Sequence, residues 1–289
     1  MRNYLTIDVE DYYQVSAFEP IVGAEKWDQY PSRVVENTRR LLEVLDRHGV
    51  TATFFVLGWI GERHPGLVKD ITERGHFVAC HSHQHRLIYE LTPKKFKKDT
   101  RRAKDVLEQI IGKRVVGYRA PSYSITRQSW WAYDILSDLG FEYSSSVFPI
   151  HHDRYGIPNA PRFRFNVPGH DLVEYPISTV RFLGQNMPVS GGGYFRIFPY
   201  WLTKMGLSRI NKVDRQPFVF FVHPWETDPE QPRMRRANAV SKFRHYTHLR
   251  KTLGRFEKLL NDFQFIPILK HKIRQNNWVK IIKIILIIL

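Results

Sequence analysis

The sequence predicts an α/β fold with parallel strands. Along the first 140 residues, short apolar runs rich in β-branched and aromatic residues alternate with amphipathic stretches. Such alternation puts helices outside a parallel sheet, either doubly wound or rolled into a barrel. Polar clusters follow several of the apolar runs directly, and α/β folds place their functional sites at that end of the strands. With 289 residues the chain is long enough to bury one large core.

The elements of the first half are marked by their end signals. Residues 4–10 form an apolar strand that ends in carboxylates, and a helix over 32–48 has Ser32 as its cap and Gly49 as its stop. The other elements show β-branched runs for strands, or Pro and Gly at the ends of helices. They are strands over 50–57, 76–80 and 115–118, and helices over 65–74, 93–111 and 127–139.

In the second half of the chain, the alternation of predicted strands and helices is interrupted. Residues 144–216 are rich in Pro, Gly and aromatic residues, which predicts long loops and short antiparallel strands. The glycine run 191–193 indicates a flexible turn, since it lacks the lysine and helix of a phosphate loop. The later elements are a strand over 217–222, a helix over 241–261 and a strand over 263–268. We see no internal repeat and no linker, so we expect one catalytic domain over residues 1–268.

The net charge and composition indicate which classes of partner and which compartment to expect. The net charge of +16 favours acidic partners, but the cations are spread along the chain without a nucleic-acid-binding motif, so no specific nucleic acid is expected. The one cysteine, Cys80, lies in an apolar run and is expected to be a buried thiol. The N-terminus shows no secretory signal pattern, which predicts a cytoplasmic protein.

The tail over residues 269–289 is first basic and then apolar. Its last twelve residues, WVKIIKIILIIL, are nearly all apolar but too few to span a bilayer, which takes about 20. The tail either lies on an anionic membrane surface or is a disordered or packed extension.

Two segments carry the candidate chemistry. Asp8, Glu10 and Asp11 end the first strand, and His81 and His85 directly follow the third. A carboxylate with two imidazoles is a ligand set for a divalent metal that keeps open coordination positions. A second carboxylate beside the metal would serve as a general base. In an extended chain Asp8 and Glu10 share a face, whereas Asp11 lies on the other and is expected to cap or turn the chain.

Three further residues follow strands. Arg119 comes after the fourth strand and would pair with a carboxylate, unless it is a surface arginine. His223 ends the strand over 217–222 and would supply a proton to a leaving group, unless it is a core histidine. His83, between the two other histidines, is expected to point elsewhere if its neighbours bind metal.

These segments together resemble the polysaccharide deacetylase family, carbohydrate esterase family 4. The residues that carry the resemblance, from about residue 4 to about residue 266, are Thr6-Ile7-Asp8, His81-Ser82-His83-Gln84-His85, Arg119-Ala120-Pro121 and the late strand that ends in His223. The chain is most similar to the exosortase-associated branch of exopolysaccharide deacetylases. The segments similar to that branch are Asp8 to Val15, Arg119 to Thr126, His152 to Gly156, His223 to Glu226 and Asp228 to Arg233.

The resemblance implies a deformed (β/α) barrel of about seven strands and metal-dependent removal of N-acetyl groups from amino sugars of a glycan. It implies Asp8 as the catalytic base, Arg119 as the residue that orients it and His223 as the general acid. His81 and His85 match the metal ligands. Many members have a second aspartate where this chain has Val9, so we assign the third ligand to Glu10, with Asp11 in reserve; the metal implied is most plausibly Zn²⁺.

The resemblance leaves the surroundings of the site open. Ser144-Ser145-Ser146 stands where related sequences tend to carry an aspartate, so the support for the acid is not assigned. A backbone N–H near Tyr123 would hold the oxyanion, and Tyr123 and Trp225 are the substrate-binding candidates. Tyr12, Tyr13 and Tyr194 either line the glycan cleft or fill the core. The competing functions are a metal-independent amide hydrolase on the same fold and a catalytically inactive glycan-binding protein.

Overall fold

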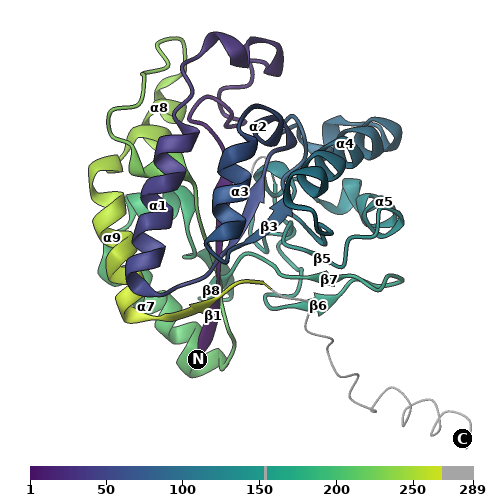
Figure 1. Cartoon of the computed structure of the whole chain (residues 1–289). Helices are drawn as coiled ribbons and strands as arrows, with labels where there is room; N and C mark the ends of the chain where they lie inside the picture. Colours follow the sequence, from purple (N-terminus) through teal and green to yellow (C-terminus); the bar gives the residue numbers. More distant parts are fainter. Residues whose placement is uncertain (153–154, 269–289) are drawn as a thin grey trace, which may run out of the picture.

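The computed structural model describes residues 1–152 and 155–268. Seven strands run parallel and side by side, and they curl into a half-barrel (Figure 1). In spatial order they are β10 (Val219–Val222), β1 (Arg2–Val9), β2 (Thr53–Val56), β3 (Phe77–Cys80), β4 (Gly117–Tyr118), β5 (Tyr143–Ser144) and β7 (Val173–Glu174). The α/β class and the deformed barrel of about seven parallel strands are thereby confirmed.

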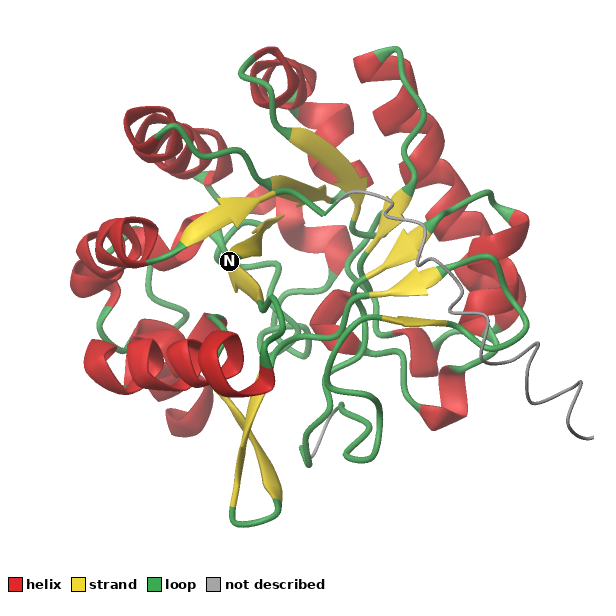
Figure 2. Ribbon diagram, turned by 90° about the horizontal axis from the view of Figure 1, so that it is seen from below, coloured by secondary structure: helices red, strands yellow, loops and turns green. Residues whose placement is uncertain are grey.

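Short strands complete the two ends of this sheet. The strand β6 (Phe165–Asn166) pairs antiparallel with β7, and β11 (Gln264–Ile266) pairs parallel with the start of β1. The strands β8 (Thr179–Phe182) and β9 (Gln185–Pro188) form a separate antiparallel hairpin, which projects from the body at the lower edge of Figure 2.

Helices cover the outer face of the curled sheet (Figure 2). They are α1 (Val34–His48), α2 (Gly58–Arg63), α3 (Pro65–Glu73), α4 (Pro93–Ile111), α5 (Ala132–Asp138), α6 (Gly192–Ile197), α7 (Tyr200–Arg209), α8 (Ala239–Tyr246) and α9 (Leu249–Asp262). The predicted bounds of α4 are confirmed, because Thr92 caps the N–H of Lys95 and Gly112 takes the left-handed conformation that ends the helix. Among the described residues, no helix combines the length and apolarity needed to cross a bilayer. The predicted membrane tail lies outside the described residues.

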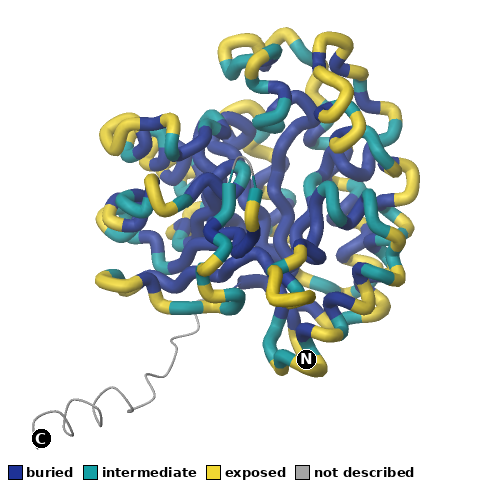
Figure 3. Tube along the Cα trace, turned by 180° about the vertical axis from the view of Figure 1, so that it is seen from behind, coloured by how far each residue is buried: buried dark blue, intermediate teal, exposed yellow. Residues whose placement is uncertain are grey.

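The alternation of side chains along β1 decides what enters the barrel. Leu5, Ile7 and Val9 are fully buried in the cluster under the outer helices. The alternate residues therefore point into the barrel, where Thr6 and Asp8 lie beneath its open end. The inner part of the trace is dark blue in Figure 3, which marks buried residues, and Asp8 is only 2% exposed, so its carboxylate is held in a low-dielectric setting.

The structure corrects the prediction of loops over 144–216. The predicted short antiparallel strands are present as β8 and β9, but the segment also contains the helix α6, which begins within the glycine run at Gly192, and the helix α7. Gly191 has a φ of 130°, and a Cβ built there would lie 2.0 Å from the carbonyl oxygen of Phe221. The predicted flexible turn is thus a fixed approach of two backbones, which only glycine allows.

The predicted single helix over 241–261 is two helices, α8 and α9. They are separated at His248, which has a φ of 56°. The guanidinium of Arg196 donates to backbone carbonyls at this break, which gives them partners that a continuous helix would have supplied. The carbonyls belong to Arg244, His245 and Thr247.

Candidate active site

The strand ends bring the sequence-predicted residues into one cluster. It lies at the carboxyl ends of β1, β3, β4 and β10, and within it His223 Nε2 is 3.9 Å from Asp8 Oδ2 and 4.0 Å from Glu10 Oε1. The cluster consists of Asp8, Glu10, His81, His85, Arg119 and His223.

Glu10 and the two histidines form the tightest group. Glu10 Oε1 lies 2.9 Å from Nε2 of His81 and 2.9 Å from Nε2 of His85. Burial acts to raise the pKa of Glu10, but the charges of His85 and His223 and hydrogen bonds from both neighbouring imidazoles hold it well below its usual range. Glu10 is therefore the anionic member of a three-residue cluster.

The hydrogen bond on the far side of His81 fixes its tautomer. His81 Nδ1 lies 2.9 Å from the carbonyl oxygen of Arg119, and a carbonyl only accepts, so Nδ1 carries the proton. In the neutral ring the Nε2 lone pair then points at an anionic oxygen of Glu10. Two acceptors at this distance require a cation or an extra proton between them, and such an N–H anchor is typical of a metal-binding histidine.

The loop that carries His85 is held in an unusual backbone conformation. Ser82 and His85 both have positive φ values, 65° and 53°. The Ser82 hydroxyl accepts the backbone N–H of His85, and Asp99 from α4 accepts that of His83. Non-glycine residues in this region are strained, and such strain concentrates at functional sites.

The donors fit a divalent metal. One carboxylate and two imidazole nitrogens lie within 4.8 Å of one another, and all three residues are buried. Such N/O ligand sets suit Zn²⁺ and leave coordination positions open. Asp11 is not part of the group. Its carboxylate instead accepts N–H groups at the start of α1 and the Ser32 hydroxyl at 2.7 Å.

This corrects the predicted cap of α1. Ser32 does not cap the helix; it donates its hydroxyl proton to Asp11, which caps the first turn from across the chain. Asp11 thus acts as a cap, as predicted from its position on the strand face opposite to Asp8 and Glu10.

Asp8 is bound by a completely buried arginine. Arg119 Nη1 donates to Asp8 Oδ1 at 2.6 Å and to the Thr6 hydroxyl at 2.8 Å, and the Arg119 side chain is 0% exposed. The rest of the guanidinium donates to the backbone oxygen and hydroxyl of Ser145. Arg119 thus fixes the Oδ1 side of the Asp8 carboxylate, and Asp8 lines the cavity described below.

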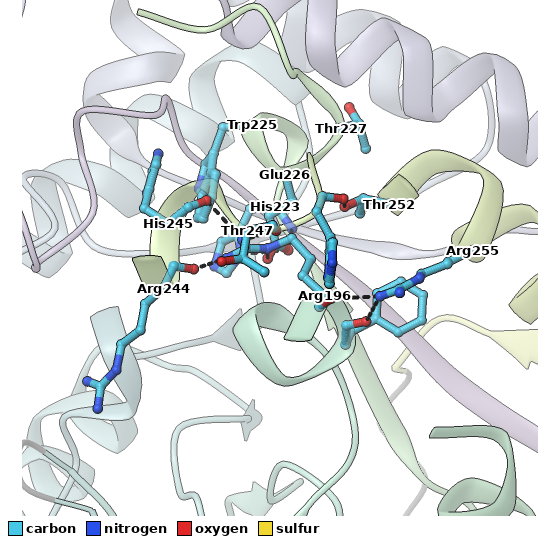
Figure 4. A network of polar contacts seen from close by, with 12 residues as sticks. Arg196, His223, Trp225, Glu226, Thr227, Arg244, His245, Thr247, Thr252 and Arg255 are labelled. Carbon is cyan, nitrogen blue, oxygen red and sulfur yellow. Dashed lines mark hydrogen bonds and ion pairs between the residues drawn. The ribbon is translucent and has the colours of Figure 1, made fainter. Parts of the chain in front are cut away.

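His223 is positioned by residues that the sequence did not predict. Its Nδ1 lies 3.1 Å from Glu226 Oε2, and the same oxygen accepts the backbone N–H of His223 at 2.9 Å. Glu226 Oε1 accepts from Nε of Arg196 at 2.7 Å (Figure 4). The spacing His-x-x-Glu was the available sequence signal for Glu226, whereas Arg196 offered none.

The buried contacts among Arg196, Glu226 and His223 shift the pKa values of His223 and Glu226. Burial lowers the pKa of His223, but the negative charges of Glu10, Glu226 and Asp8 outweigh it and raise the pKa to about 9. Burial raises the pKa of Glu226, but Arg196 and His223 outweigh it and lower the pKa to about 2. In this arrangement His223 holds a proton near neutral pH, which a general acid needs.

A cavity of about 330 Å³ opens above the cluster. Asp8, Glu10, His85 and His223 lie on its wall, together with six aromatic residues and with smaller or polar side chains. The aromatic residues are Tyr123, Phe148, Tyr155, Tyr194, Phe221 and Trp225. Flat apolar walls with a few convergent polar groups are typical of a ligand pocket.

The predicted aromatic residues divide between cavity and core. Tyr123, Trp225 and Tyr194 line the cavity, whereas Tyr12 and Tyr13 are fully buried and pack edge-to-face on each other. The backbone N–H of Tyr123 donates to the Ala120 carbonyl at 3.0 Å, so the oxyanion donor predicted there is already engaged.

Two other predictions concern single side chains. His83 is buried apart from the cluster, with Nε2 3.8 Å from Glu62, in keeping with its predicted orientation. Cys80 is a free, fully buried thiol whose pKa burial raises.

Comparison with known proteins shows which sequences and structures the chain is similar to. Residues 24–144 match the polysaccharide deacetylase family, and residues 145–271 match a domain of unknown function, DUF3473. A peptidoglycan-N-acetylglucosamine deacetylase of Bacillus cereus is 30% identical over 78 residues, 27% of this chain and 28% of that protein. A peptidoglycan deacetylase-like protein of Gibberella zeae is 33% identical over 110 residues, 37% of this chain and 32% of that protein. The matches thus span about a third of the length of these curated relatives.

Solved structures share the fold. A Mycobacterium smegmatis protein named as a polysaccharide deacetylase superposes with a TM-score of 0.54 at 19% identity, covering 93% of this chain and 94% of that one. A Pseudomonas aeruginosa protein of the same name gives a TM-score of 0.58 at 12% identity, covering 89% and 83%. Residues 24–144 are thus similar in sequence to the polysaccharide deacetylase family, and the half-barrel as a whole shares the fold of solved structures that carry this name.

Proposed function

We propose that this chain is a metal-dependent hydrolase that removes N-acetyl groups from the amino sugars of a polysaccharide. The observation that carries the proposal is the position of Glu10 Oε1, 2.9 Å from both His81 Nε2 and His85 Nε2, beside a carboxylate held by a buried arginine. When bound by these three residues, a divalent ion, most plausibly Zn²⁺, would polarise an acetamide carbonyl and a water molecule.

The chain's own groups supply the proton transfers. Asp8 takes the proton of the attacking water, and the hydrogen bond from Arg119 holds Asp8 in position at the cavity. His223 gives its proton to the departing amine from Nε2, because Nδ1 is held by Glu226. The products are acetate and a free amino sugar, and Tyr123 and Trp225 would bind the sugar ring on the cavity wall.

We further propose that the substrate is a glycan of exopolysaccharide or cell-envelope biosynthesis. Support comes from the segments similar to the exosortase-associated branch, and from relatives whose names refer to peptidoglycan. The cavity suits this substrate class, because its lining combines aromatic side chains, which match the apolar faces of sugar rings, with polar side chains that can bind hydroxyl groups.

Acetate release from N-acetylglucosamine oligomers tests the proposal. The chain is stripped with a chelator, reconstituted with Zn²⁺ and compared with Asp8→Asn, which keeps the size of the side chain but not its basicity. We expect activity only with metal, and a roughly 10²- to 10⁴-fold loss in Asp8→Asn. Activity that survives stripping would favour the metal-independent amide hydrolase. A chain that binds glycan and metal but releases no acetate from any N-acetylated glycan offered would favour the inactive glycan-binding protein.

A further inference from the structure

Exposed apolar side chains gather on one part of the molecule, away from the cavity. Among the described residues, ten large apolar side chains are strongly exposed, and six of these fall between residues 182 and 213. We call them the hairpin–α7 surface: Phe182, Leu183, Met187, Trp201, Met205 and Val213. None of the six lines the cavity.

The register of the hairpin shows which way its apolar residues point. Val180 pairs with Met187, and Phe182 lies two residues further along β8, so these three side chains share one face. Asn186, on the opposite face, donates to the carbonyls of Pro149 and Pro158 and packs that side against the loop. The exposed face of Phe182 and Met187 is therefore the one turned away from this loop.

The helix α7 carries the same kind of surface beside the hairpin. Its inner side is buried through Thr203, Gly206 and Leu207, and Gly206 lies against Val189, which follows β9. Trp201 and Met205 are one turn apart on the other side, 64% and 57% exposed. The neighbouring α7 and β8 thus present exposed apolar residues from two elements.

The segment that carries this surface is rich in cations. Residues 175–213 contain five Lys or Arg and no Asp or Glu, and Arg181, Arg209 and Lys212 are exposed. Arg181 lies on the Asn186 face of the hairpin, whereas Arg209 follows Trp201 and Met205 at four-residue spacing along α7. Two acids close to this segment are paired with cations: Asp262 with Lys204 of α7, and Asp214 with Arg162. The hairpin–α7 surface therefore combines exposed apolar side chains with exposed Arg and Lys side chains from the same segment.

We propose that the hairpin–α7 surface docks on an anionic lipid membrane. Exposed Trp, Phe and Leu enter the headgroup boundary, and Lys or Arg beside them meet the negative lipid charge. A second copy of this chain fits less well, because it would bring the same positive charges against one another. The proposal does not depend on the proposed deacetylase activity, and it concerns a surface other than the tail.

Vesicle flotation of the full chain tests it. We expect binding to vesicles of phosphatidylcholine with phosphatidylglycerol, weak binding to phosphatidylcholine alone, and weaker binding as salt rises. The variant Arg181→Gln/Arg209→Gln/Lys212→Gln should lose roughly 100-fold in partitioning, since each cation near an anionic surface contributes about fivefold. Phe182→Ser/Leu183→Ser/Trp201→Ser/Met205→Ser should lose at least about tenfold.

The matched control is Val240→Ser/Phe243→Ser, which removes apolar side chains of similar exposure, 61% and 59%, from α8. It should bind vesicles like the wild type. Absence of wild-type binding, wild-type-like binding by the charge variant, or an equal loss in the α8 control would overturn the proposal. Self-association in lipid-free light scattering that the four-residue variant abolishes would overturn it too, since the occupant would then be a second copy. Because the charge variant changes only surface side chains, it decides the question even if the apolar variant unfolds.

Discussion

Nδ1 of His223 lies 3.1 Å from Oε2 of Glu226, three residues further along the chain; His223 lines the cavity and Glu226 is fully buried. Glu226 is in turn bound by Arg196, whose remaining donors are taken by backbone carbonyls at the α8–α9 break. The candidate acid is therefore supported by its own loop and by the later helices. Residues 144–146, where related sequences tend to carry an aspartate, do not support His223. These serines instead form hydrogen bonds with Arg119 and Glu174.

The first prediction concerns Glu226→Gln. Loss of the carboxylate charge should lower the pKa of His223, which Glu226 helps to raise to about 9. Because the acid is lost as pH rises through this pKa, the alkaline limb of kcat/KM should move to lower pH in the variant. The pH profile of acetate release measures it, and an unmoved alkaline limb would contradict the assigned support.

The second prediction concerns Arg119→Lys. A lysine keeps the charge but lacks the fork that binds Asp8, Thr6 and Ser145 together. We expect kcat to fall by at least about tenfold with little change in KM, and the melting temperature to fall, because a buried network is broken. Arg114→Lys is the control, since Arg114 is 68% exposed, and it should leave both quantities unchanged.

The third prediction concerns stability alone. In Asp11→Asn an NH₂ group takes the place of one of the two accepting oxygens, so either the α1 cap or the hydrogen bond from the Tyr12 N–H is lost. The free energy of unfolding should fall by about 1 kcal/mol, the usual size of a helix cap. Urea unfolding measures it, and Asp46→Asn, whose carboxylate is bound only by the half-exposed Arg74 pair, should change stability by less. An Asp11→Asn chain as stable as the wild type would refute the capping role.

Local patterns predicted the strands and the residues at their ends. The alternation along β1 put Asp8 and Glu10 on one face, and the cluster after β3 put His81 and His85 beside them, because parallel strands end together. The split of 241–261 into two helices was not predictable, since it depends on Arg196, 48 residues before the carbonyl of Arg244 that it binds. The helices over 192–209 were missed because glycine and proline flank them, and the packing of Gly206 on Val189 is visible only in three dimensions.

The most direct test is the zinc content of the wild type, Glu10→Gln and Asp11→Asn, measured after reconstitution and extensive dialysis. The account predicts about one zinc per chain in the wild type and in Asp11→Asn, and little or none in Glu10→Gln, because Glu10 supplies the only carboxylate that faces both His81 and His85 among the described residues. Zinc retained by Glu10→Gln, or lost from Asp11→Asn, would contradict it.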